Sequence, residues 1–332
     1  MRSLSLIIPD LLPIPAGIQS RDLPITPCLN RLLSRSDRQS APHDYADMLA
    51  HIAGIDTTLP IAALRYQNDS QRIPQEYCLC ADPVHLAPGR EGMVLFDSGH
   101  FSLQQAEVAA LSAAIAPLLK ESGYRLETPV PDRWYLLSEQ PFGITSSALY
   151  NVAGGDIGMH LPTEREWRQF FNELQMLLHE CEVNQARETR GELPINSLWF
   201  WGEGDMPALE SPGKEKSATW FTHEACAAGL ANQLQHACHA QPDCQQALAA
   251  VANGNVNVVF DRLPASGGCA DAASWLAFLE HLETDWCGPL YHALQSGRLQ
   301  VLKLYLPGYM HVIRRRDLLR FWRQSKNMLL RQ

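Results

Sequence analysis

The chain has 332 residues, enough for two domains of ordinary size or for one domain with a large insertion. Hydrophobic residues make up 46% and charged residues 19% of the chain, which excludes a wholly disordered or fibrous protein. The net charge of -9 argues against nucleic-acid binding over the whole surface, so any site for a polyanion would be local.

No stretch of the chain is long and apolar enough for a membrane span. The longest nearly apolar run, at 109–119, falls well short of the about 20 residues that a span needs. Pro9 and Asp10 interrupt the apolar start, which argues against a secretory signal core. Nine scattered cysteines, an odd number, fit reduced thiols rather than a disulfide framework. We therefore expect a cytoplasmic protein.

The first elements in the chain predict an α/β sheet. Residues 4–8 form a short apolar run that is typical of a parallel strand, and Thr26-Pro27 marks the start of a helix. The strand pattern returns three times, beside helical stretches rich in Ala and Leu, at 197–201, 255–260 and 301–306. Strands that alternate with helices in this way indicate a sheet covered by helices on both faces.

The middle of the chain has a different texture, with many prolines and short alternating segments. Helices are predicted at 102–120 and again from 162, where an apolar stripe indicates packing against a core. We therefore predict an inserted α+β domain with a returning helix at 71–194. It interrupts a discontinuous core made of 1–70 and 195–332.

Five polar residues are the candidates for a ligand site. Asn184, Arg187 and Arg190 follow one another at three-residue spacing, which lets amide and guanidinium groups converge on one anion. A solvated helix end is the alternative interpretation. With Asp82 and His85 nearby, we expect these residues to form an anion pocket that faces the core.

The segment 311–332 is strongly basic, with seven Arg or Lys residues against the single acid Asp317. It predicts an amphipathic docking helix in which Leu318 and Trp322 pack on the core. Its arginines would then face an acidic partner, a second subunit or a polyanion. Alternatively, the cations merely complement a helix end.

Several motifs, in order along the chain, resemble a known superfamily. The run LIIPD ending at Asp10 and the segment TPCLNRLL at 26–33 resemble the opening of alkaline-phosphatase-like proteins. CADPVHL at 80–86 and SLWFWGEG at 197–204 look like cofactor-independent phosphoglycerate mutases of archaeal type. The combination ADPVHL, NELQMLLH and NSLWFWG is most similar to bacterial RpfE-type regulatory proteins.

The resemblance implies an alkaline-phosphatase-like α/β core interrupted by a domain that covers the substrate. It also implies in-line phosphoryl transfer by a Ser or Thr nucleophile between two divalent ions. Asp10 matches the position of a metal ligand and is a possible remnant of that site. Where the mutases place the nucleophile, only Thr57 or Thr58 could serve.

The downstream metal motifs of the family are missing from this sequence. After the strand at 255–260 the family shows Asp-Glu-Ala-Gly-His, whereas this chain reads LPASGGC; after 301–306 it shows Asp-His, whereas this chain reads PGYMH. One Asp cannot hold two divalent cations, which normally share six or more protein ligands. The other acids and imidazoles that could substitute are scattered, namely Asp205, His223, Asp261 and His311.

We therefore expect a catalytically degenerate phosphoglycerate-mutase-like protein with a binding or regulatory role and no cofactor. Its ligand would be a phosphorylated or carboxylated small molecule, or a protein partner. Two alternatives remain open. One is an active phosphomutase or phosphohydrolase with a rearranged zinc or manganese site, and the other is a pure protein-interaction module.

Overall fold

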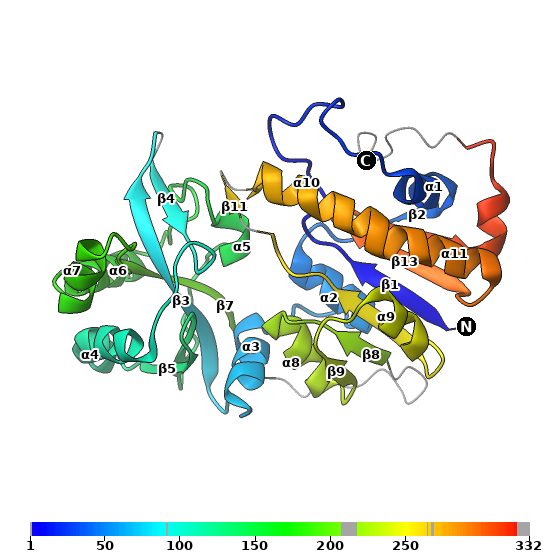
Figure 1. The fold of residues 1–332 in the computed structure, drawn as a ribbon. Coiled ribbons are helices and arrows are strands. Elements are labelled where there is room, and N and C mark those ends of the chain that lie inside the picture. The colour runs from blue at the N-terminus through cyan, green and yellow to red at the C-terminus, as the bar shows by residue number, and fades with distance from the viewer. Residues whose placement is uncertain (1, 91, 207–217, 264, 267–268, 324–332) are drawn as a thin grey trace. The chain divides into compact units, whose positions relative to one another are not determined.

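The computed structural model describes residues 2–90, 92–206, 218–263, 265–266 and 269–323 (Figure 1). The chain divides into two compact units. Unit 1 comprises Met1–Leu59, Leu209–Pro264 and Ala270–Gln332, and unit 2 comprises Pro60–Ala208 and Ala265–Cys269. The discontinuous unit therefore ends at residue 59, before the expected boundary at 70, and resumes at residue 209, after the expected boundary at 195.

Unit 1 is built on a seven-stranded sheet in the order β2-β14-β13-β1-β10-β8-β9. The five strands from β13 to β9 are parallel, whereas β14 is antiparallel to both of its neighbours. The strands are β1 (Ser3–Ile7), β2 (Asp37–Ser40), β8 (Ala218–Phe221), β9 (Ala237–His239), β10 (Asn255–Val259), β13 (Val301–Leu306) and β14 (Tyr309–Arg314).

The helices of unit 1 include two irregular segments, the π-helix η1 and the 3-10 helix η2. In chain order they are α1 (Pro27–Arg35), α2 (Tyr45–Ala53), α8 (Ala225–Gln233), α9 (Cys244–Ala250), α10 (Ala272–His281), η1 (Leu282–Cys287), α11 (Gly288–Ser296) and η2 (Arg315–Leu319). Between β10 and α10 the chain also forms a pair of two-residue strands, β11 (Ala265–Ser266) and β12 (Cys269–Ala270). Ala265–Cys269 belongs to unit 2.

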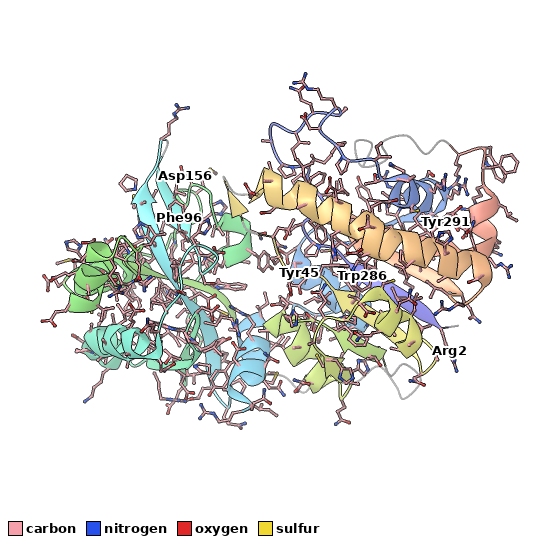
Figure 2. All side chains as sticks on the ribbon, in the orientation of Figure 1. Arg2, Tyr45, Phe96, Asp156, Trp286 and Tyr291 are labelled. Carbon is pink, nitrogen blue, oxygen red and sulfur yellow. The ribbon has the colours of Figure 1, made fainter. Side chains whose placement is uncertain are left out.

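One face of the seven-stranded sheet is apolar. Successive strand residues point to opposite faces, and the even-numbered residues of the central strands are Leu or Val. They pack with α1, α9, α10, η1 and α11 in one hydrophobic core (Figure 1). Trp286 of η1, labelled in Figure 2, is buried there with its ring edge-on to Phe260 at 5.1 Å between centroids. This face is the hydrophobic core that the apolar runs predicted.

Unit 2 contains a five-stranded sheet. Its strands run in the order β4-β3-β6-β5, and β7 also pairs with β3. They are β3 (Tyr77–Pro88), β4 (Met93–Phe96), β5 (Arg125–Val130), β6 (Arg133–Ser138) and β7 (Ser197–Gly204). The helices of unit 2 are α3 (Ile61–Ser70), α4 (Gln105–Glu121), α5 (Leu149–Val152), α6 (Arg165–His179) and α7 (Glu182–Thr189).

The placement of β7 corrects the predicted domain organisation. We expected β7 in the same sheet as β1, but it pairs with β3 from Ser197 opposite Val84 to Gly204 opposite Cys78. At Gly204 an added Cβ would lie 2.8 Å from Pro60, so the strand and the start of α3 approach closely. An apolar run shows that a strand is buried on both faces, but it does not show which strands lie beside it.

The C-terminal segment also differs from the prediction of one amphipathic helix. His311 lies in β14, which forms a hairpin with β13 around Gly308 at φ +84. Leu318 is buried as expected, whereas Trp322 is 68% exposed, and 324–332 lie outside the described residues. Pro307-Gly308 directly after an apolar strand is a turn signal, and it explains why the chain reverses into a second strand here.

Several arginines of this segment contact the chain itself. Arg314 and Arg320 form ion pairs with Asp37, and Arg323 donates a hydrogen bond to the Ser36 carbonyl oxygen at 2.6 Å. A docking role for the segment therefore stays a prediction. Among the described residues, no helix has the length and apolar character needed to cross a membrane.

Candidate functional site

The carboxyl ends of the parallel strands in unit 1 gather polar residues. Asp10 follows β1, His223 follows β8, and Asp261 and Arg262 follow β10. In open α/β sheets, ligands bind outside the carboxyl ends of the strands. This edge of the sheet is therefore the candidate functional site.

The Asp10 carboxylate is held by Arg262 and by the main chain. Its Oδ1 lies 2.9 Å from an Arg262 guanidinium nitrogen, and its Oδ2 accepts a hydrogen bond from the Leu263 N–H at 2.6 Å. The Asp10 carbonyl oxygen accepts a bond from the Trp275 indole at 3.0 Å. Burial raises the pKa of Asp10, although Arg262 and the Leu263 N–H oppose the shift. A guanidinium is therefore bound at the expected metal-ligand position.

Arg262 links Asp10 to a second pair of residues. Its guanidinium carbon lies 5.9 Å from the centre of the ring of Tyr45, which is labelled in Figure 2. The Tyr45 hydroxyl donates to Glu224 Oε2 at 2.9 Å, and burial raises the pKa of this hydroxyl well above its usual value. Glu224 also accepts the N–H groups of Cys226 and Ala227 at the start of α8. The carboxylates of Asp10 and Glu224 are thus both bound by other groups of the chain.

The four residues that we weighed as substitute metal ligands do not gather around Asp10. His223 and Asp261 pair with each other at 3.2 Å, with more than half of each side chain exposed. His311 is buried, with its Nδ1 2.7 Å from the Ser36 hydroxyl, and Asp205 belongs to unit 2.

The donor set does not fit two divalent ions. In the described part of the chain, no three His, Cys, Asp or Glu residues are grouped closely enough to hold a metal ion. Thr57 and Thr58, the nucleophile candidates, are exposed in the loop after α2, and no hydrogen bond joins either described hydroxyl to Asp10.

Two of the predicted ligand residues, Arg187 and Arg190, share one carboxylate. Arg187 is buried, and it donates to the carbonyl oxygens of Leu193 and Ser102 and to Glu107 at 3.0 Å. Arg190 at the end of α7 is half exposed and pairs with Glu107 at 2.7 Å. Glu107 thus occupies the position that the sequence assigned to a bound anion.

The third residue of that motif, Asn184, holds the main chain. Its amide nitrogen donates to the carbonyl oxygens of Leu178 and Ile195, and its amide oxygen accepts the Ile195 N–H, each at 2.8 Å. This arrangement fastens the chain after α7 to the end of α6. It explains why an amide is needed at this position without any ligand.

Asp82 and His85 lie on β3. Asp82 is 1% exposed and accepts hydrogen bonds from Arg65 at 2.9 Å and from the Trp201 indole at 2.8 Å. His85 has its Nδ1 2.8 Å from the Pro194 carbonyl oxygen. No hydrogen bond or ion pair among the described residues joins either of them to Asn184, Arg187 or Arg190. Ligand binding by the five residues stays a prediction.

The sequence reasoning missed Arg65 and Arg262, the two partners of the key carboxylates. Arg65 stands within the apolar stretch of α3, where a buried cation is unexpected and requires a partner. Arg262 comes three residues after the end of β10, at the edge where ligands bind. Both signals are visible in the printed sequence once the strands have been placed.

Comparison with known proteins relates the chain to phosphoglycerate mutases. No family model matches. The chain is 31% identical over 127 residues to 2,3-bisphosphoglycerate-independent phosphoglycerate mutase 2 of Methanothermobacter thermautotrophicus, which covers 36% of this chain and 31% of that protein. It is 26% identical over 132 residues to a probable enzyme of the same name from Geobacter sulfurreducens, covering 39% and 33%. The matches thus span about a third of these relatives.

A solved structure of another protein shares the fold. The PH0037 protein from Pyrococcus horikoshii matches with a TM-score of 0.52 at 12% identity, over 94% of this chain and 87% of that one. The cofactor-independent phosphoglycerate mutase from Thermoplasma acidophilum matches with a TM-score of 0.48 at 18% identity, over 94% and 89%. The expected α/β fold class is confirmed, and the similarity to phosphoglycerate mutases is supported.

Proposed function

We propose that this phosphoglycerate-mutase-like protein binds a phosphorylated or carboxylated small molecule in a regulatory role, like the RpfE-type proteins that its sequence resembles. It does not catalyse two-metal phosphoryl transfer. The observation that carries the proposal is the ion pair between Asp10 and Arg262 at the carboxyl edge of the sheet. The similarity to phosphoglycerate mutases suggests the ligand class, because a phosphoglycerate carries both a phosphate and a carboxylate.

Electrostatics explains why this ion pair opposes metal binding. Two metal ions that stabilise phosphoryl transfer need several anionic or imidazole ligands around them. Near a protein surface, two unit charges of the same sign about 4 Å apart repel by about 4 kcal/mol, and a divalent ion doubles that cost. A cation beside Asp10 would therefore have to displace Arg262, and the described residues offer no group of three ligands in compensation.

Metal analysis and an activity assay test the proposal directly. Protein purified without chelator is expected to hold no stoichiometric zinc or manganese, and not to interconvert 3- and 2-phosphoglycerate when either ion is added. Arg262→Met frees Asp10 and is expected to increase weak Mn²⁺ binding in a titration. Arg21→Met, an exposed loop arginine, is the control and should not change it.

Two outcomes would contradict the proposal. Two equivalents of metal together with turnover by the wild-type protein would establish an active mutase with a rearranged site. Failure of a panel of phosphorylated and carboxylated compounds to bind in calorimetry would overturn the small-molecule ligand and favour a protein-interaction module.

A further inference from the structure

The second face of the seven-stranded sheet carries a polar row. The row has one residue from each of four neighbouring strands, which lie in register: Lys303 of β13, Ser5 of β1, Asn257 of β10 and Trp220 of β8. With neighbouring strands about 4.8 Å apart, the row extends for about 14 Å. Strands in the middle of a parallel sheet are normally apolar on both faces. A row of cation, hydroxyl and amide at the centre of this sheet therefore requires an explanation.

A cavity of about 370 Å³ lies over this row. Its floor is formed by residues of β13, β1, β10 and β8, and His51–Gly54 at the end of α2 line it as well. The volume is near the lower end of the range for ligand pockets, about 300 to 1,000 Å³. The cavity can therefore hold a small organic molecule.

Two polar side chains on the floor are buried without a partner. Ser5 is 4% exposed and Asn257 is 7% exposed, and neither side chain makes a hydrogen bond within the described part of the chain. The neighbouring Ser3 differs, because its hydroxyl lies 3.2 Å from Asn255 Oδ1. A buried polar group without a partner is unfavourable, so the floor is suited to a ligand that supplies hydrogen bonds.

Among the described residues that line the cavity, Lys303 carries a positive charge and none is an Asp or a Glu. His51 and His236 also line it. The Trp220 indole donates to His236 Nδ1 at 3.1 Å. Burial raises the pKa of Tyr305 to about 12, which keeps its hydroxyl protonated. The walls therefore suit an anion.

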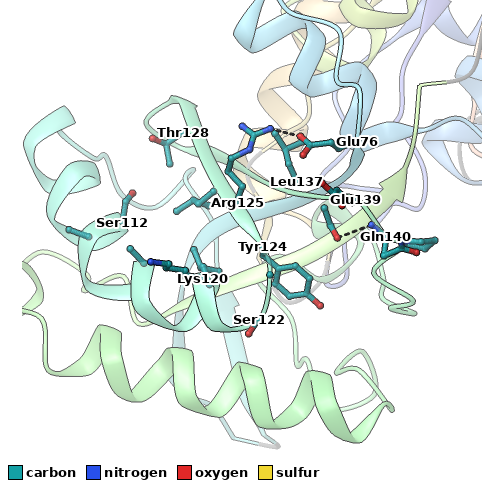
Figure 3. A pocket seen from close by; sticks show the side chains of 17 residues that line it. Glu76, Ser112, Lys120, Ser122, Tyr124, Arg125, Thr128, Leu137, Glu139 and Gln140 are labelled. Atoms are coloured by element: carbon teal, nitrogen blue, oxygen red, sulfur yellow. Dashed lines mark hydrogen bonds and ion pairs between the residues drawn. The ribbon is translucent and has the colours of Figure 1, made fainter.

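A larger cavity in unit 2 gives a useful contrast. It measures about 1010 Å³ and is lined by α4, β5 and the end of β6 (Figure 3). Arg125 on its wall is already paired with Glu76 and with Glu127, and Figure 3 shows the contact with Glu76. Acids and bases share these walls, so its charges select no class of ligand.

We propose that the cavity on the polar face of the sheet in unit 1 binds a small hydroxylated organic anion, either a carboxylate or a phosphate monoester. Lys303 attracts the anionic group, Ser5 and Asn257 bind its hydroxyls, and Trp220 forms one wall. The inference rests on the proposed function for the ligand class alone. It places the ligand on the face of the sheet, away from the Asp10 edge.

Calorimetric titration of the full chain tests this site. The probes are 3-phosphoglycerate, glycerate and inorganic phosphate, with glycerol as the neutral compound. Asn257→Asp keeps the shape of the side chain and adds a negative charge to the floor. We expect it to weaken binding of the organic anions about tenfold or more, because like charges brought together cost several kcal/mol.

Matched variants separate a local effect from a general one. Asn232→Asp on the exposed face of α8 makes the same change in net charge and should bind like the wild type. Lys303→Met should lose affinity as well, whereas Lys120→Met, at an exposed position in unit 2, should not. The Lys303 variant also tests the site if Asn257→Asp fails to fold.

The outcomes distinguish this inference from the proposed function. Equal affinity of the wild type and Asn257→Asp, or no binding of any anionic probe, would overturn the cavity as an anion site. If Arg262→Met lost binding while Lys303→Met bound like the wild type, the proposed ligand function would stand. The cavity would then be rejected as the place where the ligand binds. Metal-dependent turnover by the wild type would reject the proposed function whichever variant binds.

Discussion

Each unit contains a carboxylate and a guanidinium 2.9 Å apart, and their surroundings differ. In unit 2, the side chains of Arg65 and Asp82 are 9% and 2% exposed, and Trp201 donates to the same carboxylate. In unit 1, the side chains of Arg262 and Asp10 are 29% and 12% exposed, at the carboxyl edge of a parallel sheet. Water can replace a lost partner in unit 1 but not in unit 2. The same contact is thus scaffold in one unit and a candidate site in the other.

The largest effect is expected from breaking the buried pair. Arg65→Met leaves the Asp82 carboxylate buried without its counter-charge and should lower the free energy of unfolding by about 3–5 kcal/mol. Urea unfolding followed by circular dichroism measures the change. Arg262→Met breaks the more exposed pair and should cost much less.

A double variant sharpens this prediction. Replacing both charges of the buried pair, in Arg65→Met with Asp82→Leu, should recover part of the loss, because no buried charge then lacks a partner. If the single Arg65 variant were as stable as the wild type, burial would not be what distinguishes the two pairs.

An intermediate effect is expected from Arg187, which the sequence placed in a ligand pocket. Arg187→Met removes charge-assisted hydrogen bonds to Glu107 and to two carbonyl oxygens and should cost about 1.5–3 kcal/mol. Arg190→Met, at a half-exposed position on the same carboxylate, should leave the thermal midpoint nearly unchanged. A scaffold role predicts unchanged binding of 3-phosphoglycerate in both variants. Weaker binding with normal stability would restore the ligand role.

The smallest effect concerns the pH dependence of stability that Asp10 contributes. Burial raises its pKa above the ordinary value of 3.8, so the folded protein keeps this proton to a higher pH than the unfolded chain does. The stability contributed by this group is therefore fully present below pH 3.8 and falls as the pH rises through the folded pKa. Relative to Asp10→Asn, which cannot ionise, the wild type should lose stability across that window.

Urea unfolding at several pH values from 3.5 to about 7 measures this difference. Asp56→Asn in the exposed loop after α2 is the control, and it should show no comparable trend. A wild type that gains stability relative to Asp10→Asn as the pH rises would contradict the burial of Asp10.

Local sequence patterns predicted several elements but not their neighbours. The strands at 255–260 and 301–306 and the helix that begins at Thr26-Pro27 agree with β10, β13 and α1 to within a few residues. The strand predicted at 197–201 lies within β7, but β7 belongs to the other sheet. A short apolar run reports burial, whereas its partners are decided by contacts between residues far apart in the chain.

The same limit applies to the candidate sites. Asp10 was recognised because the end of a strand is visible in the sequence, but its partner Arg262 comes from another strand. Ser5, Asn257 and Lys303 stand in segments that we predicted to be apolar strands, and they form a row only through the register of three pairings. The spacing of the charges in one segment predicted that Arg187 lies on a helix face. It could not predict that the Glu107 carboxylate, from another helix, takes the place of the expected anion.

The position of β1 has a consequence for biosynthesis. This apolar strand lies between β10 and β13, and Ser3 meets Asn255 across 252 positions of the chain. A ribosome adding about 5–20 residues per second needs roughly 13 to 50 s to reach Asn255 and about 15 to 60 s to reach Val301, the partner of Ser3 in β13. The five strands of the sheet in unit 2 lie between Pro60 and Ala208, so they can pair before the partners of β1 have been synthesised. A nascent chain released before β13 would expose an unpaired hydrophobic strand, which makes chaperone capture or aggregation its expected fate.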